Sequence, residues 1–99
     1  MIDKREPADY YQQVEAGYDR LAPSYDEDIG ANLIGTRMRQ VFRKALLRVF
    51  KPGQRVFEIG CGTGIDALFL ARHGLDVVAT DISREMVEQV LQKAKRAGL

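Results

Sequence analysis

The segment from Val56 to Gly64, which reads VFEIGCGTG, constrains the fold of this chain more than any other feature. Its apolar start predicts a short buried strand, and glycines at positions 60, 62 and 64 predict a tight turn from that strand into a helix. Glycine tolerates left-handed backbone angles and lets a ligand lie directly against the main chain. Because the turn delivers the N–H groups of a helix start, the pattern favours a loop that binds a nucleotide-type cofactor.

Residues 54–99 are predicted to form the first βαβα unit of a parallel sheet in a cofactor-binding domain. Strands are expected at 56–59 and 76–80, with a helix at 63–73 between them. Ser83 is the expected N-cap of a final helix, whose apolar residues recur at helical spacing.

Residues 1–53 are predicted to form an amino-terminal cap of two helices. Apolar residues at helical spacing mark the first helix as far as Leu21, and Pro23 stops it. Residues 30–35 are expected to form a loop that leads into the second helix, which ends at Lys51-Pro52-Gly53.

The expected fold class is α/β, a Rossmann-like parallel sheet with helices on both faces. It is expected to be incomplete, because the sequence provides two strands and about four helices where a doubly wound sheet needs more strands. We therefore expect the chain to be the amino-terminal half of a domain. The outer edges of a two-stranded sheet are unpaired, which favours a homo-oligomer formed through the open sheet edge.

Composition excludes several classes of protein. The chain is 45% hydrophobic and 29% charged, as globular domains are, and its net charge of +1 gives no argument for a nucleic-acid partner. The longest apolar run, 67–71, is too short to cross a membrane, and the polar residues 1–7 do not resemble a secretory signal. The single cysteine, Cys61, fits a reducing compartment, and no metal-ligand spacing occurs. A cytoplasmic protein is expected.

Two observations separate the glycine loop from a dinucleotide loop. The dinucleotide fingerprint places its third glycine where this chain has Ile65. Glu58, two residues before the first glycine, would repel a pyrophosphate but attract an ammonium or sulfonium group. No Gly-Lys-Ser/Thr follows the glycines, which excludes a P-loop. A nicotinamide or flavin cofactor is therefore the weaker alternative.

Three segments resemble the class I methyltransferases that use S-adenosylmethionine. Residues 58–64 (EIGCGTG) look like motif I of that family, and 77–83 (VVATDIS), followed by Met86, are similar to its next motif. Residues 18–26 (YDRLAPSYD) resemble the amino-terminal cap of the small-molecule branch. The resemblance covers nearly the whole chain. It implies transfer of a methyl group from S-adenosylmethionine to a small-molecule acceptor, with S-adenosylhomocysteine as the other product.

The resemblance also implies which residues contact the methionine and ribose parts of the cofactor. Glu58 would face the amino group, and Asp81 would accept hydrogen bonds from the two ribose hydroxyls. The loop under the methionine part would consist of Gly60, Cys61, Gly62 and Gly64. From the residues alone, Asp81 could instead be a charge placed at a helix N-terminus.

The adenine ring and the methyl-transfer site are assigned in the same way. Ile82 and Met86 would pack on the adenine, since a thioether suits an aromatic face. Tyr18 and Tyr25 would close over the methyl-transfer site. Met86 and Tyr18 also lie on apolar helical stripes, where simple packing is the competing interpretation.

The sequence names no catalytic residue. In the family, the general base and the acceptor pocket come mainly from later strands and loops, so we expect this chain to be catalytically incomplete on its own. The alternative function is a half-domain without catalysis, which self-associates as a swapped or strand-paired oligomer with or without cofactor.

Overall fold

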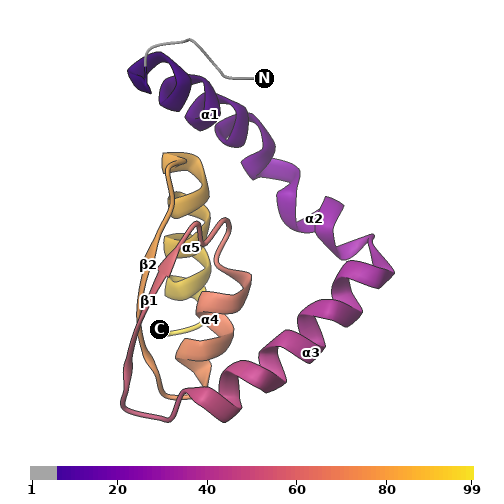
Figure 1. Cartoon of the computed structure of the whole chain (residues 1–99), viewed down its shortest axis with the longest axis vertical. Coiled ribbons are helices and arrows are strands. Elements are labelled where there is room, and N and C mark those ends of the chain that lie inside the picture. The colour runs from indigo at the N-terminus through magenta and orange to yellow at the C-terminus, as the bar shows by residue number, and fades with distance from the viewer. Residues whose placement is uncertain (1–6) are drawn as a thin grey trace.

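The computed structural model describes residues 7–99, so positions 1–6 of the expected cap lie outside the described residues (Figure 1). In chain order, the elements are α1 (Pro7–Leu21), the 3-10 turn η1 (Ala22–Ser24), α2 (Tyr25–Gly30), α3 (Leu33–Val49), β1 (Arg55–Ile59), α4 (Ile65–Arg72), β2 (Asp76–Thr80) and α5 (Arg84–Arg96).

The described part of the chain contains one sheet, in which β1 and β2 pair in parallel. The register places Val56 opposite Val77 and Ile59 opposite Thr80, so both strands end at the same edge. The helix α4 connects them, as a parallel pair requires. The expected Rossmann-like α/β architecture is confirmed, and both strands lie where the sequence predicts them.

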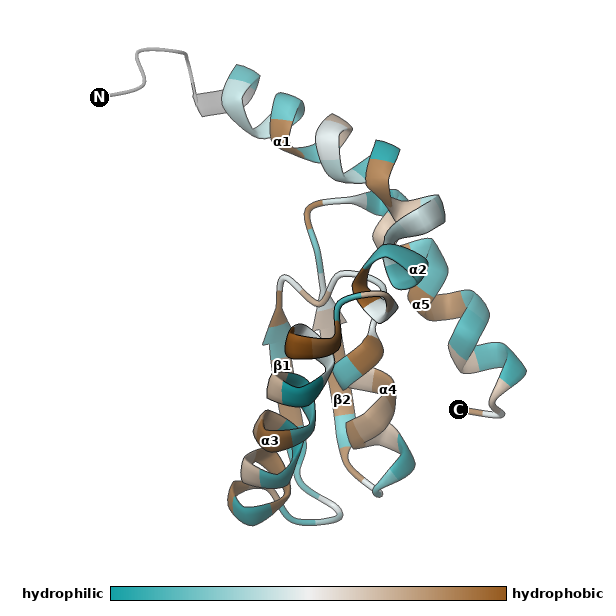
Figure 2. Ribbon diagram, turned by 90° about the vertical axis from the view of Figure 1, so that its right-hand side faces the viewer, coloured by the Kyte–Doolittle hydropathy of each residue, from teal (hydrophilic) through white to brown (hydrophobic). Residues whose placement is uncertain are grey.

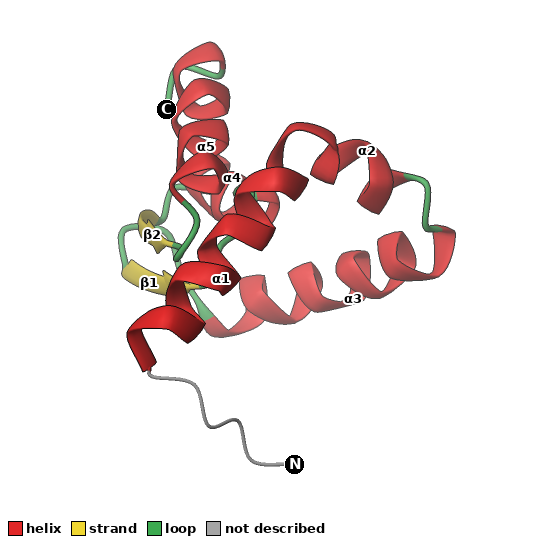
Figure 3. Cartoon of the chain, turned by 90° about the horizontal axis from the view of Figure 1, so that it is seen from above, coloured by secondary structure: helices red, strands yellow, loops and turns green. Residues whose placement is uncertain are grey.

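Helices pack on one face of this sheet. Val56 of β1 forms a buried core with Leu70 of α4 and Leu75, and residues of α3 and Val77 of β2 pack around it. In Figure 3, seen from above, both strands lie to one side of α3, α4 and α5. The division into 1–53 and 54–99 stays a prediction; α3, from the first segment, contributes to the core of the second.

The opposite face of the sheet is uncovered among residues 7–99, whereas the sequence predicts helices on both faces. Side chains alternate between faces along a strand, so Phe57 and Val78 point away from the core. Phe57 is 63% exposed. The residues that form the core around Val56 come from α3, α4 and β2, and the second face is left to solvent.

The cap differs from the expected two helices, because residues 7–49 contain a third, short α-helix. The structure contradicts the expected loop at 30–35: Gly30 ends α2, and α3 already begins at Leu33. Asn32 caps α3, its side-chain oxygen accepting from the backbone N–H of Gly35 at 2.8 Å. Gly30 and Gly35 therefore lie within α2 and α3. The acidic residues in the first turn of α2 stabilise that helix through its dipole.

The long helix α3 keeps much of its apolar surface exposed. Figure 2 shows hydrophobic residues along this helix, beside the sheet and α4. The exposed ones are Leu33, Ile34, Met38, Val41, Phe42 and Val49. None of the helices in the described part of the chain has the length and apolar character needed to cross a bilayer.

Candidate cofactor-binding site

A cavity of about 510 Å³ opens at the carboxyl ends of β1 and β2. The structure brings together most of the residues that the sequence predicts for the site, from the cap, the glycine loop and β2 through α5. They are Tyr18, Tyr25, Gly60, Gly62, Asp81, Ile82 and Met86. Ile59 and Thr80, the last residues of the two strands, also line the cavity although the sequence motifs did not single them out. The sequence signal that could have identified both residues is their position at the ends of the two predicted strands.

The glycine loop exposes its backbone toward this cavity. Gly60 and Gly62 have φ angles of +73° and +58°, in the left-handed region. A Cβ atom built on Gly60 would meet nothing within 4 Å, and one on Gly62 would meet only the ring of Tyr25, at 3.8 Å. A ligand can therefore lie directly against this part of the main chain.

Gly64 has a different role from the two glycines before it. Its φ is +82°, and a Cβ there would lie 2.7 Å from Cγ2 of Val90 on α5. The residue does not line the cavity, and its place under the methionine part of the cofactor stays a prediction. The structure shows it at the N-cap of α4, where its missing side chain lets α5 approach the loop.

Asp81 stands at the end of β2 with both carboxylate oxygens oriented by backbone donors. Oδ2 accepts from the N–H of Gly62 at 2.8 Å, and Oδ1 accepts from the N–H of Ser83 at 2.8 Å. A carboxylate oxygen can accept more than one hydrogen bond, so each retains capacity for a ligand hydroxyl. The glycine loop and the following turn thus fix an acceptor pair at the cavity wall.

Met86 and Ile82 form the wall beyond Asp81. Met86 is only 1% exposed, and its backbone N–H donates to Ser83 Oγ in the first turn of α5. Ile82 lies at the exposed rim. Tyr18 comes from α1 and Tyr25 is the first residue of α2.

Glu58 does not line the cavity. It shares the helix-covered face of β1 with Val56, and its Oε2 is buried without a hydrogen-bond partner among the described residues. Burial raises the pKa of this carboxyl, the charge of Asp66 raises it further, and Arg39 partly offsets both. Glu58 is therefore a carboxyl group next to the cavity-forming loop whose Oε2 is removed from water and accepts no hydrogen bond.

Cys61 points away from the cavity into the protein. Its side chain is buried, and its backbone N–H donates to the carbonyl of Thr80 at 2.8 Å. Burial, together with the charges of Asp81 and Glu58, raises the pKa of the thiol to about 11. The thiol is thus protonated at neutral pH and is not a nucleophile.

Comparisons with known proteins agree with this geometry. A family of methyltransferase domains matches residues 56–99. A demethylmenaquinone methyltransferase of Renibacterium salmoninarum is 37% identical over 89 residues, which cover 88% of this chain and 35% of that protein. One from Clavibacter sepedonicus is 35% identical over 78 residues, covering 77% of this chain and 31% of that protein. The chain belongs to the class I S-adenosylmethionine-dependent methyltransferases.

A third relative matches a shorter stretch. The magnesium-protoporphyrin O-methyltransferase of Rhodobacter capsulatus is 53% identical over 36 residues, which cover 36% of this chain and 16% of that protein. No solved structure matches the chain. This methyltransferase chain spans about a third of the length of its two demethylmenaquinone relatives.

The cofactor S-adenosylmethionine carries an ammonium group and a ribose, and the residues of motif I and at the end of the following strand fit these two groups. Glu58 is a buried acceptor without a donor, and Gly60 leaves space where any Cβ would stand. Asp81 has acceptor capacity at the other end of the loop. Within the described residues, no cluster of side chains is arranged to hold a metal ion.

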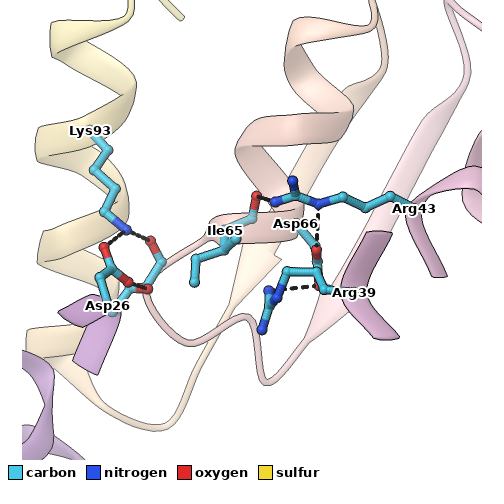
Figure 4. Close-up of polar contacts among 7 residues, drawn as sticks. Asp26, Arg39, Arg43, Ile65, Asp66 and Lys93 are labelled. Carbon is cyan, nitrogen blue, oxygen red and sulfur yellow. Dashed lines mark hydrogen bonds and ion pairs between the residues drawn. The ribbon is translucent and has the colours of Figure 1, made fainter. Parts of the chain in front are cut away.

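Polar contacts that the sequence did not predict connect the helices around the candidate site (Figure 4). Asp66 of α4 pairs with Arg39 at 3.2 Å and with Arg43 at 3.1 Å, and Arg43 also donates to the carbonyl of Ile65 at 2.9 Å. On the other side of the loop, Asp26 pairs with Lys93. The partners lie far apart in sequence, so spacing could not reveal them.

Proposed function

We propose that this chain binds S-adenosylmethionine in the cavity at the ends of β1 and β2. Asp81 carries the proposal, because its oriented carboxylate faces the same cavity as the bare backbone of Gly60 and Gly62. Asp81 accepts from the ribose hydroxyls, and the loop lies under the methionine part. Glu58 does not line the cavity, so its unpaired oxygen would act on the ammonium group through a bridging water. Ile82 and Met86 cover the adenine.

The proposed reaction is methyl transfer to a small-molecule acceptor. When bound, the cofactor supplies an electrophilic methyl group on its sulfonium sulfur, and the protein chiefly positions donor and acceptor. Support comes from relatives named for demethylmenaquinone and magnesium-protoporphyrin. Tyr18 and Tyr25 line the cavity, and we assign them to its methyl-transfer side. We also propose a cytoplasmic location, which the buried free thiol of Cys61 supports.

Calorimetric titration of the purified chain with S-adenosylhomocysteine tests the proposed cofactor. We expect saturable binding that Asp81→Asn weakens about tenfold, since a hydrogen bond to a charged group is worth about 1.5–3 kcal/mol. Asp76→Asn is the matched control, because Asp76 begins the strand that Asp81 follows but pairs with Arg55 away from the cavity.

Circular dichroism establishes that each chain is folded before titration. No saturable binding by a folded chain would contradict the proposal, and saturable binding of NAD instead would favour the nicotinamide alternative. We expect no methyl transfer by the 99-residue chain alone, and turnover by the pure chain would contradict that expectation.

As the alternative function, we propose a non-catalytic half-domain that self-associates, supported by the sheet face and the strand edges that residues 7–99 leave uncovered. Phe57 and Val78 expose an apolar surface that a second copy would cover. Sedimentation should show a concentration-dependent oligomer that Phe57→Ser weakens, whereas Tyr11→Ser on α1 should leave it unchanged. A monomer at every concentration would contradict this proposal.

A further inference from the structure

A pair of neighbouring residues, tyrosine followed by aspartate, occurs twice in the cap. The pairs are Tyr18-Asp19 at the end of α1 and Tyr25-Asp26 at the start of α2. Both tyrosines line the cavity. Both aspartates instead contact the sheet–helix body, because consecutive residues of a helix point in directions about 100° apart. In each pair, the tyrosine lines the cavity, and the aspartate anchors the cap by its contact with the sheet–helix body.

Asp19 anchors the end of α1 to the start of α5. Its Oδ1 accepts from Ser83 Oγ and, at 3.3 Å, from the backbone N–H of Glu85. Ser83 is fully buried, and its hydroxyl also caps α5 by accepting from Met86. The positive end of the helix dipole favours a carboxylate at this position. The anchor residue Ser83 follows Asp81 by two positions.

Asp26 anchors α2 to the glycine loop and to the last turn of α5 (Figure 4). Its Oδ1 accepts from Thr63 Oγ1, and its Oδ2 pairs with Lys93 Nζ. Lys93 also donates to the carbonyl of Thr63 at 3.0 Å, which closes a triangle of three residues. Thr63 is 1% exposed and lies between Gly62 and Gly64.

We propose that Asp19 and Asp26 are positioning residues that hold Tyr18 and Tyr25 over the cofactor cavity. The proposal rests on the proposed function, namely that this cavity binds S-adenosylmethionine. The two anchors attach to the segments that carry Gly62 and Asp81, so the cap is fixed relative to the groups that contact the ligand. Occupation of the cavity and attachment of the cap therefore favour each other.

Titration with S-adenosylhomocysteine compares wild type with Asp19→Asn, Asp26→Asn and Asp26→Ala. We expect Asp26→Ala to raise the dissociation constant about tenfold and Asp26→Asn to raise it less, since asparagine keeps an oxygen for Thr63. Matched controls remove a carboxylate from the same helices at residues for which no contact with the body is found: Asp9→Asn on α1 and Glu27→Gln on α2. Both should bind as wild type does.

Hydrogen exchange separates a positioning role from a general loss of stability. In Asp26→Ala, the amides of 25–30 should exchange faster while those of β1 and β2 keep wild-type protection. Ligand should slow exchange at 25–30 in wild type and have less effect in the variant. If the strands lose protection equally, the residue is merely structural and the proposal is overturned.

A double-mutant cycle tests the ion pair. Asp26→Asn and Lys93→Met should each weaken binding, and the double variant should lose less than the sum of the two. Equal affinity in wild type and Asp26→Ala would overturn the positioning role even if the cofactor binds. If the folded wild-type chain does not bind S-adenosylhomocysteine, the proposed function itself is wrong. If hydrogen exchange at the amides of 25–30 is unchanged in Asp26→Ala, Asp26 does not anchor α2.

Discussion

At the scale of single residues, the glycines of the motif share left-handed backbone angles but differ in what surrounds them. Gly60 faces open space, and Gly62 faces only the ring of Tyr25. Gly64 instead abuts Val90, so its lack of a side chain is a packing requirement. One motif thus combines ligand access at its start with helix packing at its end.

Gly64→Ala should destabilise the protein much more than Gly60→Ala. Both substitutions put an alanine at positive φ, which costs about 1–3 kcal/mol, but only the first also overlaps Val90, at about 1–3 kcal/mol more. Urea denaturation measures the difference. Val90→Ala should recover part of the loss in Gly64→Ala, and equal loss in the two single variants would contradict the packing role.

Glu58→Gln should stabilise the chain above acidic pH. Because burial raises the pKa of Glu58, the folded state holds its proton to higher pH than the unfolded state does. Wild-type stability is therefore lost as pH rises through the folded pKa, and the variant avoids that loss. Thermal unfolding between about pH 4 and pH 8 should show a gap that widens with pH.

The exposed Glu88→Gln on α5 is the control for Glu58→Gln and should show no such widening. Under the proposed function, Glu58→Gln also weakens S-adenosylhomocysteine binding. Stability and affinity would then change in opposite directions at this residue. A variant less stable than wild type at neutral pH would contradict the unpaired state of the carboxylate.

At the scale of elements, α5 is the helix on which the site depends most. Its N-cap Ser83 accepts from Met86 and donates to Asp19, so one hydroxyl both starts the helix and holds α1. By contrast, Asn32 caps α3 with a single contact, to the N–H of Gly35.

Ser83→Ala should therefore cost more stability than Asn32→Ala. Loss of the Asn32 cap is expected to cost about 1 kcal/mol, and loss of Ser83 about 2 kcal/mol, because a buried bond to Asp19 disappears as well. Chemical denaturation of the two variants gives both values. If the two losses are equal, the contact between Ser83 and Asp19 contributes nothing to stability.

Elements with strong local signals were predictable, and those stabilised by distant partners were not. Alternating glycines and apolar runs located both strands, and serine before a helical stripe located the cap of α5. The six-residue helix α2 has no apolar stripe of its own; Asp26 ties it to Lys93 and Thr63, which lie far away in sequence.

The candidate site divides in the same way. The positions of Asp81, Ile82 and Met86 follow from the end of a strand and the start of a helix, and the structure places them at the cavity. Glu58 and Cys61 belong to the same motif as the glycines, but their surroundings depend on the direction of their side chains. The motif does not specify which face of the sheet the helices cover, so it could not predict these surroundings. Neither residue lines the cavity: the side chain of Cys61 is buried, and so is Oε2 of Glu58.

At the scale of the whole molecule, α1 and α2 form an arm attached to the sheet and its helices by two carboxylates. Asp26 is the more exposed of the two. Burial opposes its ionisation, but hydrogen bonds from Lys93 and Thr63 and the positive charges of Lys93 and Arg39 outweigh burial, so its pKa lies below the ordinary value of 3.8.

Acid should release this contact. A depressed folded pKa gives stability that is present above the ordinary value of 3.8 and is lost as pH falls through the lower folded value. Wild type should melt above Asp26→Asn at neutral pH, by the small amount typical of a half-exposed ion pair, and the two should converge once the pH falls below the lowered folded pKa. A melting difference independent of pH would contradict the ionic contribution.

The distances along the chain that these anchors span have a consequence for how the protein acquires its cavity. The bond from Asp19 to Ser83 closes 64 residues, and that from Asp26 to Thr63 closes 37, whereas β1 and β2 pair across a single short crossover. Closing a long segment costs more chain entropy, so contacts of this kind form late. We therefore expect Tyr18 and Tyr25 to take their places over the cavity late in folding, and a nascent chain to complete the ligand cavity only after α5, which carries the partners of both anchors, has folded.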